Sequence, residues 1–403
     1  MARHVVIAAL LTVSLWLQAS ATEPVRFQKL QLTDKYYCDG VTTADINLDG
    51  KLDVVAGPFW YEGPDFQKAH AFYKPVPLDP APSPSNSMYS FVHDFNGDGW
   101  PDILVLGRVH LHEAHWYENP GEDLGEGKLW KSHFAFLRVL GESPAFADVD
   151  GDGEPELVAH WAGQWGFIKP NHQSPSSPWS FKPITDRADW PQFYHGTGVG
   201  DVNGDGRLDL ILNDGWWEQP AADAESPAWM PHLHRFGERG GAQMAAYDVD
   251  GDGDQDIITS LDAHGWGLAW FEQTGAVDKP EWKRHTIMGS REEEAKHGVA
   301  FSQPHALAFA DVNSDGLQDI VIGKRRWAHG PKGDIEPDGA PVVYWFELTR
   351  DENGVRYTPH LIDDASGVGV QIATADLNGD GRLDVLTASK LGVFAFVQEG
   401  AKE

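Results

Sequence analysis

Seven copies of one acidic nonapeptide are the part of this sequence with the clearest chemical meaning. Each has the form D-x-[DN]-x-D-G-x-x-[DE], which places oxygen-bearing side chains at positions 1, 3, 5 and 9 and glycine at position 6. The oxygen-bearing residues of the seven loops are Asp45, Asn47, Asp49, Asp53, Asp94, Asn96, Asp98, Asp102, Asp148, Asp150, Asp152, Glu156, Asp201, Asn203, Asp205, Asp209, Asp248, Asp250, Asp252, Asp256, Asp311, Asn313, Asp315, Asp319, Asp376, Asn378, Asp380 and Asp384.

This pattern suits a calcium ion. Calcium takes about six to eight oxygen ligands, and alternate side chains can converge on one ion where the loop curls at the glycine. Strand-like runs such as 103–105 and 257–259 follow position 9, whereas an EF-hand would continue into a helix. We therefore predict up to seven bound calcium ions; Asx-turns without metal are the alternative. We expect the third loop, in which Glu156 follows Pro155, to bind weakly.

A second group of residues with chemical potential lies between the loops. Neutral imidazoles accept protons or bind metal ions near pH 7, arginine pairs with carboxylates such as those of uronates, and aromatic side chains line ligand sites. The pair His110 and His112 could also bind zinc if a third ligand converges on it. The candidate ligand-binding residues are His115, His160, His195, His264, Trp266, His305 and Arg325.

The elements that must position these residues repeat with the loops. The first positions of successive loops lie between 47 and 65 residues apart. In the sixth repeat, strand-like segments at 306–310, 320–322 and 344–347 are followed by a fourth that ends near His360. Four short strands per repeat predict an all-β fold, a seven-bladed β-propeller of four-stranded blades. Tryptophans of the aromatic third strands are expected to fill the space between blades.

The two ends of the repeat array complement each other. The seventh loop is followed by only two further strands, the last at 393–397, so the seventh blade lacks its fourth strand. Residues 26–32 have the pattern of a strand without a blade of its own. Pairing the two segments closes the ring by the N-terminal strand and removes two exposed edges. We therefore expect residues 22–403 to form a single propeller.

Blade geometry predicts where the second group of residues meets. The acidic loops join the first and second strands at one face of the ring, so the opposite face carries the other connections. Those connections hold the candidate histidines, Trp266 and Arg325. His195 and His305 lie next to innermost strands and should reach closest to the axis. We expect the ligand site in the mouth of the central channel, on the face opposite the calcium loops.

Residues 1–21 have the features of a secretory signal peptide. A basic start and an apolar run at 5–17, which is short for a membrane span, precede the peptidase site Ala19-Ser20-Ala21. We expect an exported protein, periplasmic or secreted, that begins at Thr22 and has no membrane span after signal removal. An uncleaved anchor is the alternative.

Charge narrows the choice of partner. The sequence has 31 Lys and Arg against 61 Asp and Glu, a net charge of −30. A surface this acidic repels phosphates, which argues against nucleic acid and leaves a carbohydrate or protein ligand. Seven divalent ions would offset about half of the charge. Cys38 is the only cysteine, so no intramolecular disulfide can form. Nothing in the composition determines the oligomeric state.

The loops and their spacing resemble the FG-GAP and VCBS repeat families, whose integrin-alpha-like members form seven-bladed propellers. The resemblance extends over the whole of residues 22–403 and implies calcium binding at the loop positions in an exported protein. Lys296-His297-Gly298 with His305, and the segment 116–121, are similar to parts of the propeller domain of aldos-2-ulose dehydratase. The cupin domain of that enzyme has no counterpart in this sequence.

Three functions fit these features. The first is binding of a carbohydrate or protein ligand without turnover. The second is a lyase or dehydratase acting on sugars, in which a histidine or tyrosine base takes the proton next to a carboxyl or carbonyl group and an arginine or a metal ion stabilises the enolate. The third is a structural or adhesive surface protein. An enzyme should bring two or three of the histidine and arginine side chains together in one pocket.

Calcium removal provides a test of the acidic loops. With free calcium about tenfold above the Kd of a loop, binding contributes about 1.4 kcal/mol of stability per site. Several such sites together rival the stability of a typical domain. Excess chelator should therefore lower the Tm markedly in thermal unfolding. An unchanged Tm, with no bound ion detected by elemental analysis, would contradict the prediction.

Overall fold

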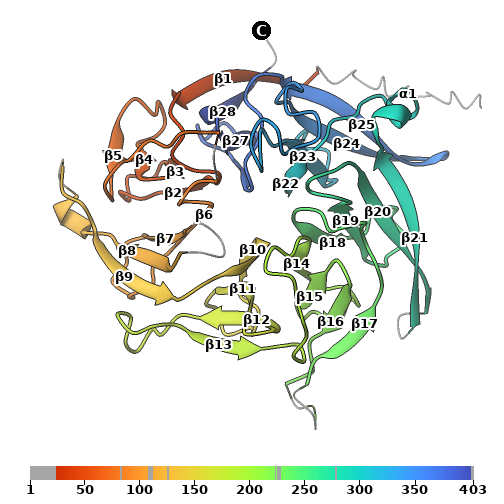
Figure 1. Ribbon diagram of the computed structural model, residues 1–403, viewed down its shortest axis with the longest axis horizontal. Coiled ribbons are helices and arrows are strands. Elements are labelled where there is room, and N and C mark those ends of the chain that lie inside the picture. The colour runs from red at the N-terminus through yellow and green to blue at the C-terminus, as the bar shows by residue number, and fades with distance from the viewer. Residues whose placement is uncertain are drawn as a thin grey trace, which may run out of the picture.

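A computed structural model describes residues 24–400, apart from 82–83, 108–111, 125–126, 223, 225–227 and 277–278. The predicted signal peptide, residues 1–21, lies outside the described residues. Seven antiparallel sheets of four strands each are arranged in a ring around a central axis (Figure 1). The prediction of an all-β, seven-bladed β-propeller is confirmed. Among the described residues, no helix has the length and apolar character needed to cross a membrane.

Each blade begins with its innermost strand and ends with its outermost strand (Figure 1). Blade 1 consists of β2 (Thr42–Ala44), β3 (Asp53–Ala56), β4 (Phe59–Tyr61) and β5 (Ala69–Ala71). Blade 2 consists of β6 (Tyr89–His93), β7 (Asp102–Leu106), β8 (Ala114–Glu118) and β9 (Lys131–Phe136). Blade 3 consists of β10 (Leu140–Ala147), β11 (Glu156–Trp161), β12 (Gln164–Lys169) and β13 (Ser180–Pro183). Blades 4 and 5 consist of β14 (Thr197–Gly200), β15 (Asp209–Leu212), β16 (Gly215–Glu218) and β17 (Met230–Leu233); and β18 (Met244–Tyr247), β19 (Asp256–Ser260), β20 (Leu268–Ala276) and β21 (Lys279–Met288). Blade 6 consists of β22 (Pro304–Ala310), β23 (Asp319–Lys324), β24 (Val343–Asp351) and β25 (Gly354–Asp363), and it is preceded by the short helix α1 (Glu294–His297).

The ring is closed by the N-terminal strand, as predicted. Blade 7 contains β26 (Ile372–Ala375), β27 (Asp384–Ser389) and β28 (Gly392–Glu399), and its fourth strand is β1 (Arg26–Thr33). The strands β1 and β28 pair antiparallel from Arg26 opposite Glu399 to Thr33 opposite Val393. This pairing joins the two ends of the described chain and leaves neither strand as an open edge at the junction.

The core lies between the blades and is built from their third strands. Trp116, Trp165 and Trp216 are among the largest fully buried side chains. One buried cluster combines Leu104 and Trp116 of blade 2 with Leu157 of blade 3, so neighbouring blades share apolar surface. The prediction that third-strand tryptophans fill the space between blades is confirmed.

Five histidines of the fourth strands have a structural role. They lie within the strands, and each ring stacks on a third-strand tryptophan with centroids 4.0–4.4 Å apart. Each Nε2 lies 2.5–3.1 Å from an oxygen of a glutamate in the third strand or next to its end. The glutamate, histidine and tryptophan of the five sets are Glu62, His70 and Trp60; Glu118, His133 and Trp116; Glu218, His232 and Trp216; Glu272, His285 and Trp270; and Glu347, His360 and Trp345.

Deletion of residues 24–33 tests the closure of the ring. The truncated protein keeps every loop but leaves β28 with unpaired backbone groups and opens the ring between blades 7 and 1. We expect loss of cooperative thermal unfolding and a tendency to aggregate, because an exposed strand edge pairs with other chains. Circular dichroism and light scattering measure both properties. A deletion variant that melts like the intact chain would show that β1 does not close the ring.

Candidate functional site

One position of the innermost strands faces the axis and carries the candidate site. It lies six residues before the first aspartate of each acidic loop, at the opposite end of the strand from that loop. In blades 3, 4 and 6 this position holds Glu142, His195 and His305. Because the blades are related by rotation about the axis, side chains at the same position approach one another from different directions.

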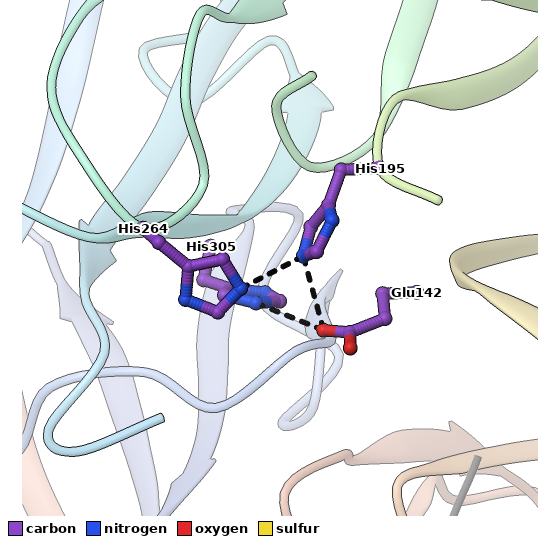
Figure 2. A group of neighbouring side chains, drawn as sticks. All are labelled: Glu142, His195, His264 and His305. Atoms are coloured by element: carbon purple, nitrogen blue, oxygen red, sulfur yellow. Dashed lines mark hydrogen bonds and ion pairs between the residues drawn. The ribbon is translucent and has the colours of Figure 1, made fainter. Parts of the chain in front are cut away.

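Blade 5 contributes through a different segment. Its equivalent position holds Ala242, which leaves room at the axis. The connection between β19 and β20 turns back toward this position, where the Ala263 backbone N–H donates a hydrogen bond to the Gly240 carbonyl at 3.0 Å. The next residue, His264, joins the side chains of the other three blades (Figure 2).

The four side chains converge on one point (Figure 2). Their ligand atoms all lie within 4.8 Å of one another. The His195 Nε2 atom lies 3.0 Å from Nε2 of His264 and 3.1 Å from Oε2 of Glu142. The same Glu142 oxygen lies 3.2 Å from Nε2 of His305. Glu142, His195 and His305 are buried, and His264 is half-buried.

Glu142 is fixed by its neighbours on both sides. Its backbone N–H donates a hydrogen bond to the Tyr194 carbonyl of the blade 3 to blade 4 connection at 2.8 Å. Its own carbonyl accepts a hydrogen bond from the Tyr89 hydroxyl of blade 2. The carboxylate is therefore held at the axis by contacts from blades on either side.

Burial keeps the imidazoles of His305 and His264 neutral. It lowers the pKa of His305 to about 4, and the nearby Arg325 guanidinium acts in the same direction. Burial, together with the imidazoles of His305 and His195, holds the pKa of His264 far below its usual range. At neutral pH these two rings therefore carry lone pairs that can accept a proton or bind a cation.

Arg325 adds a positive charge beside the cluster. Its Nη1 donates a hydrogen bond to Nε2 of His305 at 3.0 Å, and its Nη2 lies 3.7 Å from Oδ1 of Asp39. Because Nε2 of His305 accepts this hydrogen bond from Arg325, the nitrogen carries no proton. It therefore cannot donate a hydrogen bond to Oε2 of Glu142, and the lone pairs of the two atoms repel each other. A cation between Nε2 and the carboxylate would remove this repulsion.

The donor set suits a transition-metal ion. Three imidazoles and one carboxylate are the ligands that zinc, manganese, iron and related ions take, whereas calcium prefers oxygen alone. Metal–ligand bonds of about 2.0–2.2 Å put adjacent ligand atoms about 2.8–3.1 Å apart at octahedral angles and about 3.3–3.6 Å apart at tetrahedral angles, and the three short separations here, 3.0–3.2 Å, are close to the octahedral values. One lone pair of His305 cannot serve both a metal ion and Arg325, so metal binding requires Nη1 of Arg325 to move away.

A histidine–aspartate pair lies beside this centre. The His329 ring centroid is 4.6 Å from that of His264. Its Nδ1 lies 3.0 Å from the carboxylate of Asp334, which is buried, while His329 itself is largely exposed. When the carboxylate accepts a hydrogen bond from Nδ1–H, Nε2 of neutral His329 is left unprotonated and can act as a base.

Two residues with left-handed backbone flank the site. Gln303, with φ 58°, precedes the strand that carries His305, and Trp327, with φ 60°, lies two residues before His329. Side chains other than glycine rarely adopt this conformation, and it is often found at functional sites. The Trp327 Nε1 group donates a hydrogen bond to the Pro337 carbonyl at 2.9 Å, which helps to hold the segment in place.

The other predicted ligand residues lie outside the metal-ligand group. His160 is buried in β11 opposite Leu140, and its ring is 5.0 Å from that of Trp165. His115 lines a separate surface hollow with His112 and contacts Glu113. The Trp266 ring lies 5.4 Å from the Arg291 guanidinium. His110 lies outside the described residues.

Glu142 is the site residue that we did not predict from the sequence. Acidic residues are so frequent here that a single glutamate carries no signal by itself. Counting six residues back from each loop would have found it, because the same count gives His195 and His305.

The acidic loops lie on the face opposite this cluster and connect the first and second strands, as predicted. The carboxylates at position 9 are buried, and burial raises the pKa of Asp102, Asp209, Asp256 and Asp319 to about 7. A cation in the loop would stabilise their charged forms. In the fifth loop the carboxylates of positions 1, 3 and 9 lie within 4.8 Å of one another. These loops therefore fit calcium, and the calcium ligands remain a prediction.

Comparison with known proteins identifies the repeats. Residues 94–159 and 311–387 match the family described as FG-GAP-like repeat, so the chain carries FG-GAP-like repeats on a seven-bladed propeller. No curated protein sequence matches the chain. The similarity to aldos-2-ulose dehydratase stays a prediction.

Several solved structures share parts of the architecture. An Agrocybe aegerita lectin that recognises non-reducing terminal N-acetylglucosamine is 16% identical over 84% of this chain and 81% of its own, with a TM-score of 0.46. The V. cholerae biofilm matrix protein Bap1 is 11% identical over 94% and 92%, with a TM-score of 0.46. A Bacillus licheniformis rhamnogalacturonan lyase is 12% identical over 92% and 75%, with a TM-score of 0.44. None of these likenesses bears on the function of this chain.

Metal titration tests the axial cluster. We expect the protein to bind one zinc or manganese ion per chain at this site, and Glu142→Gln or His264→Asn to weaken the affinity by about tenfold or more, since even outer partners of metal ligands cost that much. His115→Asn, a histidine outside the cluster, is the matched control and should leave the affinity unchanged. Calorimetry with elemental analysis provides the measurement. Equal affinities in all four proteins would rule out a metal centre at these residues.

Proposed function

We propose that this chain is an exported, calcium-stabilised β-propeller enzyme, a lyase or dehydratase that acts on acidic carbohydrates at a transition-metal centre. The ligands of that centre are Glu142, His195, His264 and His305. The single observation that carries the proposal is the convergence of these four side chains, from four blades, within 4.8 Å. A surface with a purely adhesive role has no need of three imidazoles around one buried carboxylate.

The charges around the centre favour an anionic ligand. A metal ion on Nε2 of His305 would displace the Arg325 guanidinium, and a displaced guanidinium could pair with a carboxylate in a bidentate manner. A ligand with a carboxyl group next to a hydroxyl-rich carbon skeleton, such as a uronate, could then contact both the metal ion and Arg325. The supporting distance is the 3.0 Å between Nη1 of Arg325 and Nε2 of His305.

The chemistry that these groups support is β-elimination. Nε2 of His329, oriented by Asp334, takes the proton from the carbon next to the carboxyl group. The C–H electrons move into the carboxyl group as an enolate, which Arg325 stabilises and a cation held by the four ligands would stabilise further. The electrons return to form the carbon–carbon double bond, the C–O bond at the β carbon breaks, and the leaving oxygen takes the proton from His329.

The remaining parts of the proposal concern calcium and location. Calcium in the acidic loops would hold the face opposite the active site, and the signal features of residues 1–21 would export the protein to the periplasm or the medium. The net charge of −30 argues against nucleic acid as the substrate, whereas the carboxyl group of a saccharide could be bridged to the site by the metal ion and Arg325.

Turnover of acidic polysaccharides tests the enzyme function. The metal-loaded protein is incubated with alginate, polygalacturonate and glucuronate-containing polymers, and unsaturated products are followed by ultraviolet absorbance and mass spectrometry. His329→Gln should lower turnover by about 10²–10⁴-fold, the usual contribution of a general base, while metal content stays unchanged. Glu142→Gln should lower both turnover and metal content.

The controls separate catalysis from binding. His297→Gln changes a histidine of α1 that lines a different hollow, with Trp270 and Tyr357, and should keep full activity. Saccharide binding without any product, in protein with one metal ion per chain, would overturn the enzyme proposal in favour of a binding protein. Equal turnover in His329→Gln and the unaltered protein would remove His329 from the mechanism.

A further inference from the structure

The third acidic loop differs from the other six in what lies among its ligand oxygens. The Lys169 Nζ atom, at the end of β12, lies 2.5 Å from Oδ2 of Asp150 and 2.6 Å from Oδ2 of Asp152. It also lies 3.0 Å from Oε1 of Glu156. These residues occupy positions 3, 5 and 9 of the loop, so one ammonium group contacts three of the four predicted calcium ligands.

Strand register shows that this lysine replaces an acid. Leu157 pairs with Ile168, which puts Lys169 beside Glu156, the position 9 residue. In blade 6 the same register puts Glu347 beside position 9, and its Oε1 accepts a hydrogen bond from the side chain of Asn313 in the loop at 3.2 Å. Blades 1, 2, 4 and 5 also have an acid at this register position: Glu62, Glu118, Glu218 and Glu272.

The residue that follows this register position also differs in blade 3. In blade 1 the position 9 carboxylate of Asp53 accepts backbone N–H groups from Ile46 at 2.9 Å and from Gly63, after the third strand, at 2.8 Å. In blades 2, 4, 5, 6 and 7 the position 9 carboxylate likewise accepts a hydrogen bond from a backbone N–H in or just after the third strand. Blade 3 has Pro170 at this point, and proline has no N–H to donate. The Lys169 ammonium takes the place of the missing donor at Glu156.

Other basic side chains near the loops do not have this geometry. Arg207 and Arg382 occupy position 7 of their own loops, and each guanidinium contacts the carboxylate of position 5 alone, at Asp205 and Asp380. A cation that contacts one ligand from the rim leaves the centre of the loop accessible. Within the described part of the chain, Lys169 is the basic residue that contacts three carboxylates of one loop.

We propose that the third loop takes no calcium ion, because the Lys169 ammonium occupies the position of the ion. Calcium needs about six to eight oxygens at 2.3–2.6 Å from one centre, and an ammonium group 2.5–3.0 Å from three of those oxygens excludes it. The chain then has six loops open to calcium and one closed by its own cation. Blade 3 also carries Glu142 at the other end of β10, so the strand that positions this ligand does not depend on calcium.

Calcium stoichiometry in lysine variants tests the proposal. Lys169→Glu restores the acid found at this register position in five other blades and removes the ammonium. Lys169→Met removes the ammonium alone and keeps the test available if the glutamate variant folds poorly. Calcium per chain is measured by elemental analysis after equilibrium dialysis at saturating calcium. We expect one more ion per chain in each variant than in the unaltered protein.

Lys131→Glu is the matched control. Lys131 lies in β9 of the neighbouring blade, is largely exposed and pairs with Glu118 outside any loop. The same charge change there should leave the calcium count unaltered. We also expect the chelator-induced loss of Tm to be larger for Lys169→Met than for the unaltered protein. Equal calcium counts in the unaltered protein and both Lys169 variants would overturn the proposal, as would a gain of one ion in Lys131→Glu.

Discussion

The fold depends on one buried carboxylate per blade. In six blades the acid at position 9 accepts a backbone N–H from within the acidic loop and another from a residue in or just after the third strand. One side chain thereby fixes the turn between the first two strands and ties it to the third. A buried charge is costly unless it is hydrogen-bonded or paired, so a cation in the loop would stabilise the charged form further.

This constraint explains how two opposite faces came to differ. The loop face is dominated by repeated carboxylates whose positions are dictated by the blade itself. The residue at the other end of each innermost strand is not needed to hold a loop in place. It faces the axis and only has to fit among its neighbours. Met88 and Val370 fill that position with apolar side chains in two blades, whereas Glu142, His195 and His305 use it for polar chemistry.

The sequence was sufficient to predict the fold, because seven equal loops leave little freedom in strand number and order. It was sufficient for His195, His264 and His305 as candidates, but not for their association with Glu142. That association depends on which blades bring their innermost strands close together at the axis. It also depends on the connection after β19, which turns back toward Gly240. The role of Lys169 could not be predicted from the sequence either. The third loop has an intact motif, and the residue that contacts its carboxylates lies 13 positions beyond Glu156.

The axial cluster has a mechanical consequence as well as a chemical one. Its four side chains come from blades 3, 4, 5 and 6, which are neighbours around one side of the ring (Figure 1). An ion held there would act as a brace from blade 3 to blade 6, across the inner rim. Blades 7, 1 and 2 have no share in that brace and are held at the inner rim by backbone hydrogen bonds, from the Val370 N–H to the Asp39 carbonyl and from the Asp39 N–H to the Ser87 carbonyl. Release of the ion would therefore loosen one arc of the inner rim and leave the opposite arc held.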